Sequence, residues 1–297
     1  MVALPDRPER AMADMIYRAI QRKTVKDAWL GRLSASSIGE ECLRKLYMKF
    51  RGYNVGPQTV SVTEGRVQKI FDTGHLKELQ AVNDLRAAGF LVWDKDEDGK
   101  QFRYIDETGH FICKVDGVIK GVLGAPVTPH LLEIKSHNKK NFDRLLKEPI
   151  KESFPKHYAQ IQSGMKAMEM DRGLYVAICK DDERYHFERV RRDETELSKH
   201  DERVRTLVHD RLIPAGISAT ASAKGCRYCD FKESGQCVGR TPPARNCRTC
   251  VQSSPGPNGT WTCGLDGHEL DQKAQRAACQ SYEGKNNLDS SLYLLSG

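Results

Sequence analysis

The sequence has no apolar run long enough to cross a lipid bilayer. Its start, MVALPDRPERAMADMIYRAIQRK, also lacks the apolar core of a secretory signal peptide, because charged residues interrupt it throughout. We therefore expect a cytoplasmic protein rather than a membrane-spanning or secreted one. Reducing conditions in that compartment disfavour disulfides, so the ten cysteines need another role.

The composition predicts a soluble, folded protein with a modest positive charge. Hydrophobic residues make up 39% of the 297 residues and charged residues 29%, as in globular rather than disordered chains. The length suits one large domain with a small additional part. The net charge of +7, from 47 basic and 40 acidic residues, fits a polyanionic partner, although solubility alone would also explain it.

Apolar residues at helical spacing predict helices over residues 9–30 and 62–89, the second of which ends at Gly89. The pattern then changes to short segments rich in aromatic and branched residues, which predicts strands of one sheet. These strands are 90–96, 100–106, 110–121 and 130–136. Further along, the sequence predicts a helix over 157–170, a hairpin turned at Asp181 and Asp182, and a helix over 193–212.

One predicted strand, HLLEIKS, carries a charged pair inside an apolar run. Side chains alternate along a strand, so Glu133 and Lys135 face one side and Ile134 the other. The strand before it carries Asp116, and a hairpin would bring the two carboxylates together. Two close carboxylates repel each other unless a divalent cation lies between them, and hard oxygen ligands suit Mg²⁺ or Mn²⁺. The simpler alternative is an ion pair on an exposed edge strand.

Neighbouring segments offer further candidate ligands. Glu78 and His75 lie about one turn apart on the helix before the sheet, and either could complete a metal site. An exposed helical glutamate is the simpler interpretation of Glu78. Gln160, on the helix after the sheet, carries an amide that could position Lys135 or a phosphate, and the alternative is a surface glutamine.

The order of these motifs resembles the PD-(D/E)XK nuclease superfamily: a helical Gly-His-x-x-Glu, a strand Asp, a strand Glu-x-Lys and a Gln-bearing helix. The chain looks most like the RecB-like exonucleases, including CRISPR-associated and phage recombination members, over about residues 34–240. The resemblance implies an α/β, restriction-endonuclease-like core with a central mixed β-sheet flanked by helices. It also implies catalytic roles for Asp116, Glu133, Lys135 and Gln160, with Glu78 or His75 completing the metal site.

The sequence departs from the family pattern at two positions. Many RecB-like members have a metal-binding His four residues after the motif's Gly, where this chain has Glu78. The family's Gln-x-x-x-Tyr motif is also incomplete, because Gly164 stands where Tyr would be.

A first group of cysteines, Cys226, Cys229 and Cys237, is one ligand short of a closed metal site. Cys42 is the only cysteine near the start of the chain and is a candidate for the fourth ligand. Such thiolates can hold a [4Fe–4S] cluster or Zn²⁺, and the spacing does not choose between them. The resemblance to iron–sulfur RecB-like nucleases favours the cluster. Cys113 and Cys179, within predicted strands, are expected to be inert core residues.

A second group lies in a segment that is poor in apolar residues and therefore needs a metal to fold. Cys247 and Cys250 form a CxxC knuckle, and Cys263 and Cys279 follow it. We expect these four cysteines to bind Zn²⁺. His268 is the less favoured substitute ligand.

Basic residues directly after the Glu-x-Lys strand could follow a phosphate backbone, although a charge run is usually only a solvated surface. The DNA-binding candidates are Lys139, Lys140 and Arg144.

Together these features predict an N-terminal helical segment (1–33), a nuclease core closed by a cysteine-ligated site (34–240) and a zinc-binding C-terminal appendage (241–297). The predicted activity is Mg²⁺- or Mn²⁺-dependent DNA exonuclease action in recombination or repair. The expected partners are DNA and a recombination or single-strand annealing protein. The alternatives are a catalytically silent DNA-binding assembly factor and an endonuclease with a zinc reader module.

Overall fold

The two strands at the centre of the main sheet form where the chain is most continuously apolar. They are β8 (His130–His137) and β9 (Arg172–Cys179), which are buried along most of their length. Near-continuous burial is typical of strands covered on both faces, and the two strands pair in parallel. The helical connection between them supplies the crossover that a parallel pair requires. The computed structural model describes residues 8–28, 31–210, 212–239 and 241–285.

Antiparallel strands extend this pair on both sides and make the sheet mixed. β10 (Tyr185–Arg191) forms a hairpin with β9, as the turn at Asp181 and Asp182 predicts. On the other side, β7 (Gly117–Lys120) pairs with β8, and β4 (Leu91–Trp93) pairs with β7. The five-stranded order is β10-β9-β8-β7-β4. The predicted fold class, an α/β protein with a mixed sheet flanked by helices, is confirmed.

The prediction of one continuous strand over 110–121 is wrong. The chain breaks at Val115 and Asp116 into β6 (Phe111–Lys114) and β7, which belong to different sheets. The break brings Gly117 so close to the neighbouring strand that a Cβ there would lie 2.5 Å from the carbonyl oxygen of Trp93. The prediction of a single sheet is therefore also wrong. β6 pairs with β2 (Leu33–Ser34) and β5 (Arg103–Ile105) in a second, three-stranded sheet.

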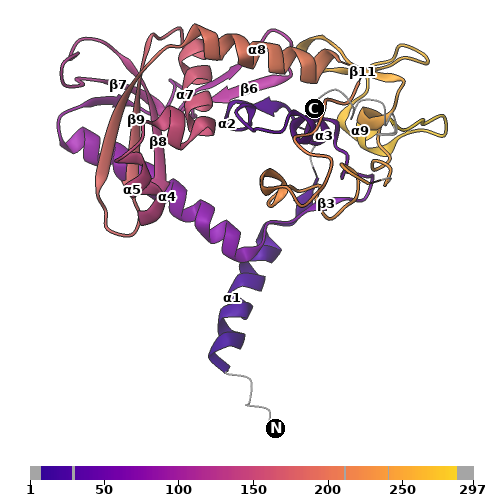
Figure 1. The fold of residues 1–297 in the computed structure, drawn as a ribbon, viewed down its shortest axis with the longest axis horizontal. Coiled ribbons are helices and arrows are strands. Elements are labelled where there is room, and N and C mark those ends of the chain that lie inside the picture. Colours follow the sequence, from indigo (N-terminus) through magenta and orange to yellow (C-terminus); the bar gives the residue numbers. More distant parts are fainter. Residues whose placement is uncertain (1–7, 29–30, 211, 240, 286–297) are drawn as a thin grey trace.

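Helices cover both faces of the main sheet (Figure 1). On one face, α4 (Gly65–Ala87) buries Val82 and Leu85 against Leu132 and Ile134 of β8. On the other face, α5 (Lys139–Leu145), α6 (Ile150–Ser153) and α7 (Pro155–Ala167) pack against Leu131 and its neighbours. The long helix α8 (Glu194–His209) lies on α7 and reaches toward the C-terminal part of the chain. The helices predicted over 62–89, 157–170 and 193–212 are thus confirmed.

The first helix, α1 (Pro8–Lys23), projects away from the rest of the molecule (Figure 1). It touches the start of α4, where a Cβ at Gly65 would lie 2.0 Å from the backbone oxygen of Tyr17. The helix predicted over 9–30 is confirmed only as far as Lys23, because the chain turns there and forms the short strand Lys26–Asp27. Met12 and Met15, which carry the apolar periodicity, are mostly exposed. No helix in the described part of the chain is both long and apolar enough to span a membrane.

The C-terminal part packs on the core through Trp261, which is fully buried beside Phe50 in a cluster that also includes Leu33. It contains β11 (Ser253–Pro255), β12 (Trp261–Cys263), α9 (Gln272–Ala277) and short 3₁₀ turns. The appendage and the core therefore share one apolar cluster. The remaining elements are α2 (Ala35–Ile38), α3 (Leu43–Arg51), and the paired strands β1 (Lys26–Asp27) and β3 (Val60–Ser61).

Gly164 shows why the family's tyrosine has no room in this chain. A Cβ at this position of α7 would lie 2.6 Å from Leu131 Cδ2 and 3.1 Å from Val115 Cγ1. We expect Gly164→Ala to destabilise the protein by about 1–3 kcal/mol through overpacking. Gly74→Ala is the matched control, because nothing lies within 4 Å of the added methyl group. It should stabilise the helix by about 0.5–1 kcal/mol. Thermal unfolding measures both changes, and a Gly164→Ala protein as stable as Gly74→Ala would contradict this packing.

Candidate functional site

The alternation of β8 places Glu133 and Lys135 on the same side of the sheet as Leu131, facing the layer of α7. Ile134 points the other way, into the cluster beneath α4. This agrees with the expectation from sequence. Glu133 lies opposite Tyr175 of β9 in the strand register, and Lys135 lies opposite Ala177.

Asp116 reaches this pair from the bend before β7. Its Oδ2 accepts a hydrogen bond from the Ile134 backbone N–H at 2.9 Å and lies 3.6 Å from Lys135 Nζ. The same ammonium forms an ion pair with Glu133 Oε1 and donates to the Ile134 carbonyl oxygen at 3.1 Å. The two carboxylates therefore both approach one cationic group. Among the described residues, no trio of potential metal-ligand atoms that includes them lies within 4.8 Å of one another.

Burial dominates the electrostatics of this pair. Glu133 is 1% exposed, and burial raises its pKa to about 8, with Lys135 opposing the rise and Asp116 adding to it. Burial alone would lower the pKa of Lys135, but the carboxylates of Glu133 and Asp116 outweigh it and raise that pKa. Lys135 therefore stays an ammonium at neutral pH.

The donor set fits a hard divalent cation. Within the described part of the chain, Glu133 Oε2 is buried and has no hydrogen-bond partner. A buried carboxylate oxygen without a donor is costly, and a metal ion would satisfy it. Burial and the charge of Asp116 raise the pKa of Glu78 on α4.

Glu78, His75 and Lys135 line one cavity of about 360 Å³, which is formed by α4 and the last part of β8. Glu78 is half-buried and electrostatically coupled to both Asp116 and Lys135, whereas His75 is exposed. Glu78 is therefore the better placed of the two candidate ligands.

The structure places Gln160 in a different cavity, of about 400 Å³. Among the described residues, no hydrogen bond joins it to Lys135, so the support expected for that lysine is not seen. Its neighbour Gln162 has a structural role, because its amide bonds the Arg191 carbonyl and the Asp193 N–H. The cavity around Gln160, which we call the serine cavity, is also lined by Gly31, Arg32, Ser34, Ser36 and Lys114.

The serine cavity is not predictable from the sequence motifs described above. The cluster SASS offered a signal, but runs of serine more often cap helices than line sites. Lys114 of this cavity lies two residues before Asp116, and Gln160 lies on α7, which packs against both β6 and β8. The serine cavity and the carboxylate site are therefore connected through the end of β6, and α7 contacts strands that carry residues of each.

A second unexpected feature is a buried aromatic cluster next to Lys135. The Tyr175 hydroxyl lies 2.8 Å from both His137 Nε2 and His157 Nδ1. Burial, with the charge of Lys135 adding to it, lowers the pKa of His137 to about 4 and that of His157 to about 3. Both imidazoles are therefore neutral near pH 7.

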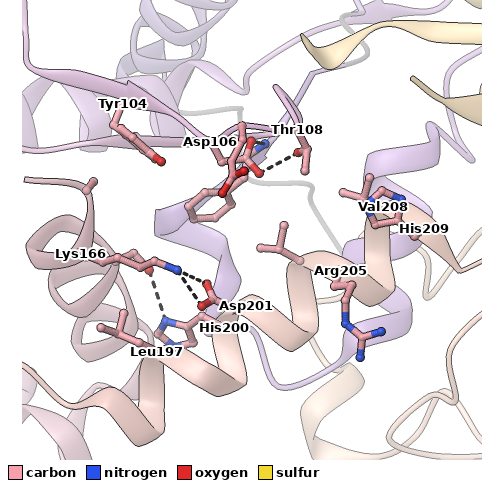
Figure 2. Close-up of a pocket in the computed structure, with 15 residues that line it drawn as sticks. Tyr104, Asp106, Thr108, Lys166, Leu197, His200, Asp201, Arg205, Val208 and His209 are labelled. Atoms are coloured by element: carbon pink, nitrogen blue, oxygen red, sulfur yellow. Dashed lines mark hydrogen bonds and ion pairs between the residues drawn. The ribbon is translucent and has the colours of Figure 1, made fainter. Parts of the chain in front are cut away.

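A further cavity, of about 390 Å³, lies between α7 and α8 (Figure 2). Within its lining, Lys166 binds the carboxylate of Asp201 and Ser163 contacts His200. None of the carboxylates around Lys135 lines it, so it is not part of the candidate catalytic site.

The candidate DNA-binding residues lie on α5 at the surface. Lys139 forms an ion pair with Asp143, and Arg144 forms one with Glu148. These i,i+4 pairs reduce the positive charge available to a phosphate backbone. Lys140 is exposed on the same helix.

The fold brings the first group of cysteines together. Burial raises the pKa of Cys226, and the nearby thiols of Cys229 and Cys42 add to this effect. Burial likewise raises the pKa of Cys237, with Arg44 opposing it and Cys42 adding to it. Cys42, which precedes α3, is therefore in the same part of the fold as Cys226 and Cys237. Over the residues that the structure describes, no three of these four thiols lie within 4.8 Å of one another.

The second group lines a cavity of about 20 Å³, large enough for a single ion. Its cysteines are Cys247, Cys250, Cys263 and Cys279. In the described chain, one trio of potential ligand atoms lies within 4.8 Å of one another: Cys263, Asp266 and His268. The four sulfur atoms are more widely spaced than that trio, so His268 stays a candidate ligand.

No protein-family model matches the chain, and no curated protein matches it. Among solved structures, an alkaline exonuclease from Laribacter hongkongensis, LHK-Exo, has 17% identity and a TM-score of 0.41, covering 65% of this chain and 90% of that one. Its complex with dAMP gives a TM-score of 0.42. SSO0001 has 13% identity and a TM-score of 0.42, covering 75% and 95%. Similarity at this level does not establish a shared activity.

Replacing Cys42 tests whether this thiol completes a metal site. We expect Cys42→Ala to lower the bound iron or zinc by one site's content and to reduce the melting temperature, because three ligands leave the site open. The matched control is Cys179→Ala, another fully buried thiol, which should keep its metal content. Elemental analysis of anaerobically purified protein measures the difference. Unchanged metal in Cys42→Ala would remove this residue from the ligand set.

Proposed function

We propose that this protein is a Mg²⁺- or Mn²⁺-dependent DNA exonuclease of the PD-(D/E)XK type, acting in recombination or repair. The observation that supports this most is the meeting of Asp116 and Glu133 at Lys135, with one buried carboxylate oxygen lacking a partner. A surface ion pair would not bury Glu133. A protein that had lost catalysis would have little reason to keep such a costly group.

In this proposal Asp116 and Glu133 hold the metal ion, and Glu78 or His75 completes its shell. A divalent ion bound there lowers the pKa of a water molecule and stabilises negative charge on the phosphate. Lys135 acts as a charged hydrogen-bond donor rather than a base, because its raised pKa keeps it protonated. It would orient the attacking water and stabilise the negative charge that develops during the displacement.

The serine cavity favours an exonuclease over an endonuclease. Arg32 and Lys114 supply positive charge, and Ser34, Ser36 and Gln160 supply hydrogen-bond donors. This lining suits a phosphate group at a strand end, held beside the carboxylate site. Gln160 would then bind substrate phosphate rather than support Lys135.

The two cysteine groups would bind metal to stabilise the fold and would take no part in catalysis. We propose that Cys42, Cys226, Cys229 and Cys237 hold a [4Fe–4S] cluster or Zn²⁺, and that Cys247, Cys250, Cys263 and Cys279 hold Zn²⁺. Both sites would tie the loop-rich C-terminal part to the core, where few apolar residues are available.

The proposal is tested by incubating the protein and Mg²⁺ with end-labelled linear DNA and with covalently closed circles. We expect release of label from linear DNA only, because the substrate phosphate must sit at an end. Cutting of circles would favour an endonuclease, and both substrates intact would favour a DNA-binding factor.

Within that assay, Lys135→Ala should slow cleavage by about 10²- to 10³-fold, the usual effect of removing one positioned donor. The control is Lys199→Ala, which removes a lysine from an exposed ion pair on α8 and should leave cleavage unchanged. Circular dichroism checks that both variants are folded. Undiminished cleavage by the Lys135 variant would exclude its catalytic role.

The raised pKa of Glu133 predicts how metal binding depends on pH. Below about pH 8 most Glu133 side chains carry a proton that must leave before the ion binds. The Mg²⁺ concentration for half-maximal cleavage should therefore fall roughly tenfold per pH unit up to about pH 8 and then level off. Mg²⁺ titrations of the cleavage rate at constant ionic strength measure this. A half-maximal concentration that does not change between pH 6.5 and 8 would contradict a direct metal bond to Glu133.

A further inference from the structure

An arginine between the first two cysteines of the appendage hydrogen-bonds a residue that lines the serine cavity. Arg248 lies in the 3₁₀ turn Cys247–Thr249 and is 3% exposed. Its Nη1 donates to the Gly31 carbonyl at 2.8 Å and to the Phe50 carbonyl at 3.1 Å. Its Nε donates to Gln275 Oε1 of α9 at 2.8 Å. One side chain thus joins the CxxC knuckle to a residue that lines the cavity.

The appendage also contacts the turn to which Arg32 of the cavity is hydrogen-bonded. Arg32, next to Gly31, donates its Nε–H to the Gly109 carbonyl at 2.5 Å. The turn that contains Gly109 is bonded in turn to the appendage, because the Gly259 N–H donates to the Thr108 carbonyl at 2.8 Å. The two backbones are so close that a Cβ on Gly109 would lie 2.1 Å from Asn258. The position of Arg32 therefore depends on contacts that the appendage makes.

Positive charge accumulates around Trp261 and Arg248. Arg248 and Arg51 both stack on Trp261, with guanidinium carbons 4.6 and 4.8 Å from the ring centre. Burial, together with the charges of Arg51 and Arg32, lowers the pKa of Arg248 to about 9. In the described part of the chain, Nε and Nη1 of the buried Arg51 have no hydrogen-bond partner. Three neighbouring arginines repel one another, and an anion in the cavity would offset that repulsion.

We propose that Arg248 is a positioning residue for substrate. Its hydrogen bond to Gly31 fixes the backbone of Gly31 and Arg32, so that the serine cavity binds the terminal phosphate of a DNA strand. The inference rests on the proposed function, because it identifies the phosphate as that of the cleaved DNA. It assigns the zinc-binding appendage a role in substrate binding. The appendage does not touch the phosphate, and it acts through Gly31 and Arg32.

The test measures binding of DNA duplexes by fluorescence anisotropy without divalent cation, so that no strand is cut. The three duplexes carry a 5′-phosphate, a 3′-phosphate or only hydroxyl ends. We expect the wild type to prefer one phosphorylated end. Arg248→Lys should reduce this preference about tenfold, as the loss of one charge-assisted hydrogen bond would. Lysine keeps the positive charge but cannot donate to Gly31, Phe50 and Gln275 together.

Two comparisons separate positioning from a general loss of structure. Arg276→Lys is the matched control, because Arg276 joins the same appendage to the carbonyls of Pro57 and Thr59, away from the cavity. It should leave the phosphate preference unchanged. Arg32→Ala should remove the preference, and adding Arg248→Lys should cause no further loss, since both changes act on one group. Melting temperature and zinc content show whether each variant is folded.

The inference is overturned if Arg248→Lys keeps the wild-type preference, if Arg276→Lys lowers it equally, or if the effects of the Arg32 and Arg248 changes multiply. A wild type that cuts DNA without any preference for a phosphorylated end also overturns it, while the proposed nuclease function stands. Conversely, a wild type that prefers the phosphorylated end but cuts nothing with Mg²⁺ overturns the nuclease and leaves the phosphate site.

Discussion

The burial of Glu133 is the constraint on which the candidate site depends. An isolated carboxylate in the middle of an apolar sheet would cost several kcal/mol, so its surroundings must compensate it. Lys135 supplies one positive charge next to Glu133. The carboxylate of Asp116 also lies beside this ammonium group. Two acids around one lysine give the centre one more acidic group than a closed ion pair needs. Once Glu133 loses its proton, the centre therefore has an excess negative charge that a cation would offset.

The break between β6 and β7 makes this arrangement possible. In a continuous strand, the side chain of Asp116 would follow the regular alternation between the two faces of the sheet. At the bend its carboxylate instead accepts the backbone N–H of Ile134, which holds it beside β8. The same break sends β6 into a second sheet, where Lys114 joins the wall of the serine cavity. One local change of direction therefore builds parts of both the carboxylate site and the proposed phosphate site.

The C-terminal appendage is integrated with the core rather than attached to it. Trp261 fills a shared apolar cluster, and buried arginines stack on its ring. Arg248 hydrogen-bonds backbone oxygens far away in the sequence, at Gly31 and Phe50. A segment with so few apolar residues can hold this geometry if metal ions tie its loops together. The folding of the appendage and the binding of substrate would then depend on the same cysteines.

Local patterns in the sequence determined the helices of the core, the β9–β10 hairpin and the orientation of Glu133 and Lys135, because helical period and strand alternation act over a few residues. They could not reveal the break at Asp116, since it depends on how closely the backbone at Gly117 approaches Trp93. They also missed the serine cavity, whose walls come from three separate stretches of chain. Exposed Met12 and Met15 show the same limit: periodicity predicts a helix, but only packing decides what that helix buries. Contacts such as that between Arg248 and Gly31 arise only after the chain has folded, because nothing in either local sequence specifies the other.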